Sequence, residues 1–277
     1  MAELPQLLTK WEFRLLLVGV IGFGGAAAFY LLALFTRPRG LRFSGTLLLL
    51  IAWMLVTLSL SARIAQAHRL PLQSRYDVTL WFVWCLVLVY LFVEDRTKVT
   101  LPGVIVALGA TGIGAALLQA DAAIWPVLPQ YVSGWFVWRG VAFGLAYALL
   151  AVATAIELSS PLYAPLVRRE AQAQVGRQER YLEFRGYAYR LVLLAFLVHS
   201  LAILSNARWR CNLDGRYWAW THDETWALVI WLTYAAYLHL RTQAHSSRRL
   251  TIAICLAGGL AVGLAYLGVS WQSGFLW

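Results

Sequence analysis

The chain has 277 residues, of which 61% are hydrophobic and only 13% are charged, and its mean hydropathy is +0.65. This composition excludes an ordinary soluble domain and indicates a polytopic membrane protein. The formal net charge is +10. Because the basic residues lie in short loops between apolar runs, the positive-inside rule explains them without nucleic acid binding. Three cysteines are too few and too scattered for a disulfide framework.

Apolar runs of membrane-spanning length recur along the whole chain. A helix that rises 1.5 Å per residue needs about 20 residues to cross a hydrocarbon layer roughly 30 Å thick. The sequence therefore predicts an all-α membrane helix bundle of about eight transmembrane helices in a single domain over 1–277. We predict the spans at about 15–36, 44–62, 78–93, 100–118, 136–156, 189–206, 225–240 and 250–270.

The longest polar connection covers about 157–188 and interleaves arginine with glutamate. It predicts a solvated amphipathic helix that joins two spans. Placing this segment and the other basic turns in the cytoplasm follows the positive-inside rule. Both termini and the loop over about 207–224 then lie outside, in a cytoplasmic (inner) or thylakoid-type membrane.

Aromatic residues concentrate in one stretch and are followed by a histidine and an arginine. The stretch contains Trp209, Tyr217, Trp218, Trp220, Trp226 and Trp231, and then His239 and Arg241. Two interpretations are open. Tryptophan gathers at membrane interfaces as an aromatic belt. Alternatively, flat aromatic faces near an imidazole suit a planar, iron-containing ligand such as haem.

The order of these residues resembles the tryptophan-rich (WWD) segment of the CcsA/ResC family of cytochrome c biogenesis proteins. The match is dense only from Tyr189 to Arg241. It includes Tyr189, Arg190, Phe196, Ala207, Trp209, Gly215, Tyr217, Trp218, Trp220, Glu224, Thr225, Trp226, Ala227, Leu228, Trp231, Leu232, Tyr234, Ala235, Tyr237, Leu238, His239 and Arg241.

The resemblance implies a role in handling haem b. His239 stands at the family's haem-ligating transmembrane histidine, and Arg241 would pair with a haem propionate. Haem would enter from the cytoplasmic side and move toward the tryptophan-rich loop, where Trp218, Trp220 and Trp226 form an apolar platform. The family works with a ResB/CcsB-type membrane partner and attaches haem to apocytochrome c. The protein would then be at most one component of a haem–cytochrome c synthase, with no acid–base catalytic residue.

Several positions depart from the family pattern. Thr221 replaces the aspartate that names the motif, His222 the following proline, Asp223 a lysine and Asp214 the first tryptophan. Arg139 occupies the position of an outer haem-ligating histidine, and no GLHSY-like segment follows the last span. Arginine cannot ligate iron, although Arg139 could bind a propionate or an acidic residue of a partner. These departures support an alternative, a structural or assembly subunit that keeps the fold and has lost the reaction.

His68, His199 and His222 offer further candidate ligands, each with an ordinary alternative. His68 and His222 are also consistent with solvated loop residues, and His199 with a hydrogen bond between packed helices. His245 lies in a basic cytoplasmic turn and is expected to be solvated. His239 itself could be a neutral histidine bonded across a helix interface.

Overall fold

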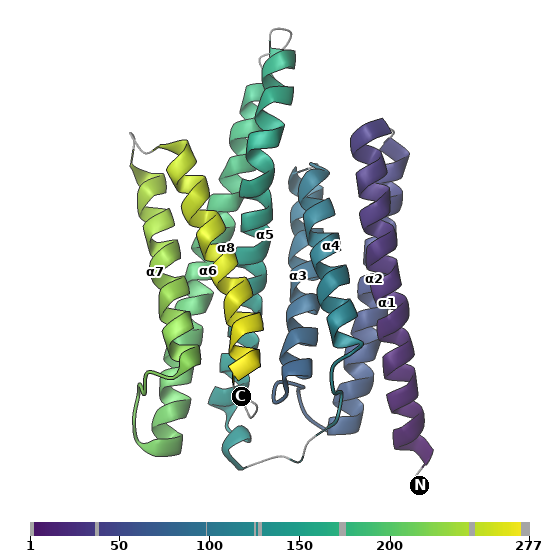
Figure 1. Ribbon diagram of the computed structural model, residues 1–277, viewed down its shortest axis with the longest axis vertical. Helices are drawn as coiled ribbons and strands as arrows, with labels where there is room; N and C mark the ends of the chain where they lie inside the picture. The colour runs from purple at the N-terminus through teal and green to yellow at the C-terminus, as the bar shows by residue number, and fades with distance from the viewer. Residues whose placement is uncertain are drawn as a thin grey trace. The chain divides into compact units, whose positions relative to one another are not determined.

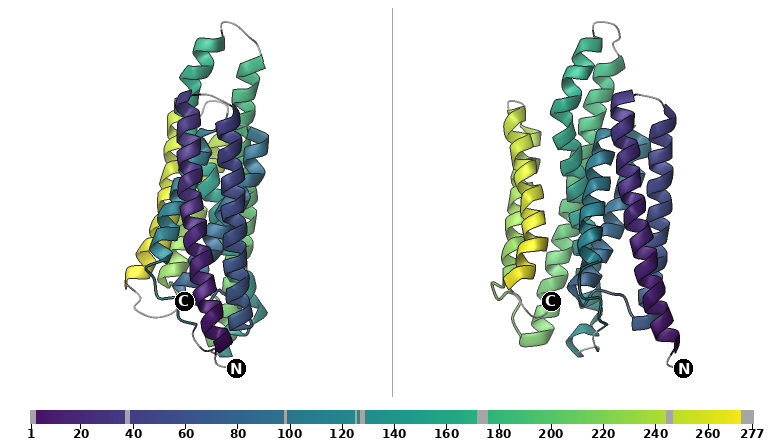
Figure 2. Two further views of the ribbon diagram at one scale, coloured as in Figure 1. Left: turned by 90° about the vertical axis from the view of Figure 1, so that its right-hand side faces the viewer. Right: turned by 45° about the vertical axis from the view of Figure 1, so that its right-hand side comes forward.

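The computed structural model describes residues 3–36, 39–97, 99–124, 126, 129–171, 176–243 and 247–272. These ranges hold eight α-helices and one 3-10 turn (Figures 1 and 2). The prediction of an all-α membrane protein is confirmed. The described chain forms two compact units, unit 1 up to Val132 and unit 2 from Ser133. The single domain expected over 1–277 stays a prediction.

Six helices contain segments long and apolar enough to cross a membrane. These segments are Trp11–Thr36, Gly40–Ala67, Arg75–Glu94, Gly134–Pro161, Phe184–Asp214 and Arg248–Ala265. The other two helices, α4 (Leu101–Leu117) and α7 (His222–Thr242), coincide with the fourth and seventh predicted spans. α4 is apolar but has only 17 residues, and α7 carries histidine, acidic and arginine residues near its ends.

Unit 1 is built from α1 (Glu3–Thr36), α2 (Arg39–Ala67), α3 (Arg75–Thr97) and α4, followed by the 3-10 turn η1 (Pro129–Tyr131). α1 packs along α2 and α4, and α3 packs against α2 and α4. Pro102 lies in the first turn of α4, where the missing backbone N–H costs nothing. The largest fully buried apolar side chains of the unit include Phe23, Leu49 and Leu80.

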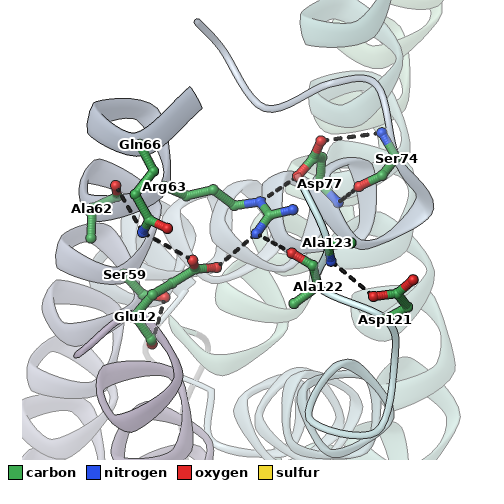
Figure 3. A network of polar contacts seen from close by, with 10 residues as sticks. All are labelled: Glu12, Ser59, Ala62, Arg63, Gln66, Ser74, Asp77, Asp121, Ala122 and Ala123. Atoms are coloured by element: carbon green, nitrogen blue, oxygen red, sulfur yellow. Dashed lines mark hydrogen bonds and ion pairs between the residues drawn. The ribbon is translucent and has the colours of Figure 1, made fainter. Parts of the chain in front are cut away.

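The buried guanidinium of Arg63, on α2, contacts three other parts of unit 1 at one end. Arg63 donates hydrogen bonds to Glu12 (3.1 Å), to Asp77 and to the backbone oxygen of Ala122 (3.0 Å). Figure 3 shows these contacts, and we call Glu12, Arg63 and Asp77 the Arg63 cluster. Its three side chains are each less than 10% exposed. The cluster therefore fastens α1, α2, α3 and the segment after α4 together.

Unit 2 is built from α5 (Gly134–Ala171), α6 (Gly176–Asp214), α7 and α8 (Arg248–Gln272). α5 packs against α6 and α8, and α7 packs against α6 and α8. α5 and α6 reach beyond the ends of α7 and α8 in Figure 1. They carry most of the polar segment expected as a separate helix over 157–188. The side chains at 162–183, which include most of its charges, lie outside the described residues.

Candidate functional site

The tryptophan-rich loop connects α6 with α7 over residues 215–221. Gly215 ends α6 in the left-handed conformation (φ +75°), and its N–H donates to the oxygen of Cys211 at 3.0 Å. Glycine is favoured at this helix-ending position because it has no Cβ. Trp220 is also left-handed (φ +56°), although it carries a large side chain. We call the end of unit 2 that holds this loop the loop end.

One carboxylate organises the loop. Glu224 is 2% exposed, and its Oε2 accepts the backbone N–H groups of Ala219 (2.9 Å) and Thr221 (3.1 Å). The bond to Thr221 belongs to a capping box at the start of α7. Oε1 accepts from Arg210 Nε (3.3 Å) and Asn206 Nδ2 (3.4 Å). Both oxygens are therefore fully engaged.

Arg139 extends this arrangement to α5. Its Nη1 donates to Asn206 Oδ1 at 2.9 Å, and its guanidinium carbon lies 4.5 Å from the ring centre of Trp209 and 5.0 Å from that of Phe136. We call Arg139, Asn206, Arg210 and Glu224 the loop-end network. It ties α5, α6 and α7 together around the loop. The expected pairing of Arg139 with a propionate or a partner stays a prediction.

The six aromatic residues singled out in the sequence divide into two groups. Tyr217 and Trp220 are 62% and 69% exposed on the loop. Trp218 and Trp226 are half-buried, and the Trp218 ring stands at 84° to that of Trp220, with their centres 5.7 Å apart. The Trp218 indole N–H is buried without a hydrogen bond. The loop therefore places two indoles at right angles, one of them open to the surroundings.

Trp209 and Trp231 instead fill helix interfaces. Trp209 is 8% exposed and packs against Phe136, with ring centres 5.6 Å apart. Trp231 donates from Nε1 to Ser200 at 2.9 Å and lies 4.9 Å from the ring of Phe196, which joins α7 to α6. The structure thus gives these two residues packing contacts, and the predicted contact with a cofactor stays untested.

His239 lies near the other end of α7, which we call the histidine end. Its side chain is exposed, and its Nε2 lies 2.9 Å from the amide nitrogen of Gln243. At 1.5 Å per residue, about 27 Å of helix separates it from Thr221. The structure therefore does not bring His239 together with Trp220. Two separate places along one helix carry the predicted chemistry.

Arg241 and a buried glutamate complete the histidine end. Arg241 donates to the backbone oxygen of Arg185 at 3.0 Å, and its guanidinium lies 5.7 Å from the ring of Tyr189. Glu157 is fully buried, and its Oε1 accepts from Tyr237 at 2.8 Å. Arg241 thus anchors α7 to α6, and its predicted pairing with a propionate stays a prediction.

Of the other described histidines, only His222 lies at either place, where it begins α7 beside the loop. His199 is 1% exposed, and its Nε2 lies 3.0 Å from the oxygen of Ala227 on α7, which is the helix-packing alternative. His68 and His222 are exposed, as expected for loop residues, and His245 lies outside the described residues. Within the described part of the chain, no group of three or more His, Cys, Asp or Glu could hold a metal ion.

The sequence analysis missed the role of Glu224. A threonine followed three residues later by glutamate, directly before an apolar run, is the sequence signature of a capping box. Thr221 and Glu224 have this spacing and could have predicted the helix start and the first loop contact. Asn206 carried no comparable local signal, because its partners come from α5 and α7.

The helices and the loop define a class, a multi-pass helical membrane protein with an ordered tryptophan-rich loop and an exposed histidine at opposite ends of one helix. The family model described as "Cytochrome C assembly protein" matches residues 15–276. The chain therefore belongs to the cytochrome c assembly protein family.

Named relatives share this assignment. The chain is 27% identical to the cytochrome c biogenesis protein CcsA of Mesostigma viride, over 97% of this chain and 94% of that protein. It is 31% identical to CcsA of Synechococcus sp. (strain CC9311), over 91% of this chain and 94% of that protein. It is 30% identical to CcsA of Chlorella vulgaris, over 90% and 86%.

A solved structure has the same fold. The chain is similar to a cytochrome c haem lyase, CcmF, with a TM-score of 0.70 and 15% sequence identity. The similarity covers 96% of this chain and 49% of CcmF, so the chain spans about half the length of that protein.

Proposed function

We propose that this protein handles haem during cytochrome c biogenesis, taking it up at His239 and passing it across the membrane toward the tryptophan-rich loop and apocytochrome c. The observation that supports the proposal most directly is the exposed imidazole of His239 at the family's histidine position. In such a protein the loop would face the periplasmic-type side, and a ResB/CcsB-type membrane protein would be the partner.

The surroundings of His239 fit a flat apolar ligand. Val229, Leu232 and His239 are exposed and lie along one face of α7 at helical spacing. A neutral imidazole is a common axial ligand of haem iron, and its neighbour Gln243 is an exposed surface residue that can move away. The macrocycle would lie along the apolar face. Bound haem supplies the vinyl groups to which apocytochrome thiols add, and the protein supplies position.

The loop end fits haem ligation less well, and this supports a second candidate function. The family's outer histidine is replaced by Arg139, whose guanidinium is buried against two aromatic rings and bonded to Asn206. Arginine at this position cannot ligate iron. The second candidate is therefore a diverged subunit that retains the fold and serves the structure or assembly of a larger membrane complex.

Haem occupancy separates the two candidates. The protein is expressed with haem available, purified in detergent with its natural partners attached, and its visible spectrum is recorded beside that of the His239→Ala variant. The haem-handling function predicts a Soret band that the variant loses, because the iron loses its nitrogen ligand.

His222→Ala is the matched control, since His222 is also exposed and lies at the opposite end of the same helix. Its Soret band should equal that of the unaltered protein. A band retained in His239→Ala would mean that another residue binds the iron. No band in any sample would leave the structural subunit as the function.

A further inference from the structure

We propose that Glu224 is the positioning residue of the tryptophan-rich loop: its carboxylate holds the backbone on both sides of Trp220 and so presents the indole of Trp220 outward. Neither the match to the family nor the capping box alone assigns this role. The positioning role stands on the geometry. The use of the presented indole by a planar ligand rests on the proposed function.

The two backbone bonds of Glu224 bracket one residue. Oε2 accepts the N–H of Ala219 at 2.9 Å and that of Thr221 at 3.1 Å, and Trp220 lies between these two residues. In a capping box, the glutamate accepts only the backbone N–H of the N-cap residue, which here is Thr221. The bond to Ala219 is additional and lies outside the helix. It fixes the backbone that precedes Trp220.

Trp220 adopts a conformation that needs such a hold. Its φ of +56° brings the Cβ of an L-residue close to its own backbone, which is unfavourable for any residue with a side chain. Strain of this kind persists only where the surrounding contacts over-determine the conformation. The indole itself is 69% exposed, so its own packing does not supply the hold. The carboxylate of Glu224 does.

The carboxylate is itself fixed from two other helices. Arg210 and Asn206 of α6 donate to Oε1, and Arg139 of α5 donates a hydrogen bond to Asn206. The titratable groups nearby are His222 and Asp223 on its own helix and Asp214, which is ion-paired with Arg210 at 3.5 Å. Glu224 therefore transmits the positions of α5 and α6 to the loop.

Hydrogen–deuterium exchange of the loop amides tests the hold without any ligand. In the unaltered protein, amides within 216–221 should exchange slowly. Glu224→Ala should speed their exchange about tenfold or more, because two charge-assisted bonds are lost. Glu224→Gln should fall between them, since its amide oxygen still accepts but its amide nitrogen repels Arg210.

Asp223→Asn is the matched control, because it removes the neighbouring carboxylate and leaves the backbone bonds of Glu224 in place. Its loop exchange should equal that of the unaltered protein. Equal exchange in all four proteins would overturn the hold. Should Glu224→Ala fail to fold, Glu224→Gln carries the same test.

Binding of protoporphyrin IX tests whether Glu224 acts through Trp220. This planar probe lacks iron, so its binding reports stacking rather than ligation, and it is followed by quenching of tryptophan fluorescence. Trp220→Gly removes the indole and suits the left-handed backbone. Trp220→Gly and Glu224→Ala should each raise the Kd about tenfold, and the double variant should bind no worse than Trp220→Gly.

The outcomes are distinguishable. Additive losses in the double variant would show that Glu224 acts on binding independently of Trp220, which overturns the positioning role in binding. If the unaltered protein does not bind the probe, the proposed delivery of haem to the loop fails, while the exchange experiment still decides whether Glu224 holds Trp220.

Discussion

The Arg63 cluster of unit 1 and the loop-end network of unit 2 use similar chemical groups for different purposes. In unit 1, two carboxylates and a backbone oxygen surround one guanidinium, and every bond fastens helices or the segment after α4 (Figure 3). In unit 2, one guanidinium and one amide donate to Oε1 of a single carboxylate, and a second guanidinium donates to that amide. Oε2 of the carboxylate accepts from the backbone of a loop. The first arrangement stabilises packing, and the second shapes a surface.

The Arg63 cluster is therefore expected to affect the stability of unit 1, and the loop-end network the conformation of the tryptophan-rich loop. Removing a group from the Arg63 cluster leaves buried charges without partners, so the cost falls on folding. Removing Glu224 leaves half-buried loop amides near the surface, where water can replace it, so the cost falls mainly on the conformation of the loop. The predictions below test whether the two effects are separable.

The largest effect is expected for Arg63→Ala. Glu12 and Asp77 would remain buried without their cation, and the stacking of Arg63 on Tyr76 (4.4 Å) would be lost. We expect a loss of about 3–5 kcal/mol in the free energy of unfolding, measured by unfolding in mixed detergent and SDS micelles. Arg14→Ala, an exposed cation at the same end of α1, is the control. A change below 1 kcal/mol would show that the cluster does not stabilise the unit.

A smaller loss is expected for Gly103→Ala in α4. A Cβ at this position would clash with the hydroxyl of the buried Tyr90, so this side chain or the helices must shift. Overpacking of this kind costs about 1–3 kcal/mol. Gly109→Ala in the same helix has nothing within 4 Å and should gain up to about 1 kcal/mol from helix propensity. Both are measured by the same unfolding experiment, and equal effects would contradict the close approach of Tyr90.

The smallest effect is a pH dependence confined to the loop. Burial opposes the charged form of Glu224, but the N–H groups of Ala219 and Thr221 and the Arg210 guanidinium outweigh it, so the pKa of Glu224 lies below its ordinary value. The stabilisation is therefore complete above the ordinary glutamate pKa and is lost as the pH falls through the lowered one. Burial raises the pKa of the neighbouring Asp223.

Loop exchange, corrected for the intrinsic rate, should accordingly stay protected above the ordinary glutamate pKa and increase as the pH falls through the lowered pKa of Glu224. The Glu224→Gln variant should show no such step, since it has no proton to gain at this position. A step that Asp223→Asn removes would show that the hold was assigned to the wrong carboxylate.

The helices could be predicted from the sequence because their signal is local. Apolar runs and basic turns placed all eight helices, and the family pattern located the loop and His239. The polar segment over about 157–188 was predicted as a separate helix, whereas most of it extends α5 and α6, a continuity that hydropathy does not indicate. The pattern also grouped Trp209 and Trp231 with Trp220, although they face helix interfaces.

The contacts between helices could not be predicted. An external partner was predicted for Arg139, because its internal partner Asn206 lies 67 residues further along the chain. The burial of Arg63 was not predicted, although it is among the largest fully buried side chains. A buried charge is located by the side chains that neutralise it, and these come from different helices. Only the fold brings them together.

The marginal hydropathy of α7 also has a consequence for how the protein enters the membrane during synthesis. α7 is not among the six helices with a segment long and apolar enough to cross a membrane, whereas α8 is, and the two pack against each other. A segment with acidic residues at one end and arginine at the other gains little from lipid alone. We expect α7 to insert together with α8 as a hairpin. The helix that carries His239 would then enter the bilayer only after α8 has also been synthesised.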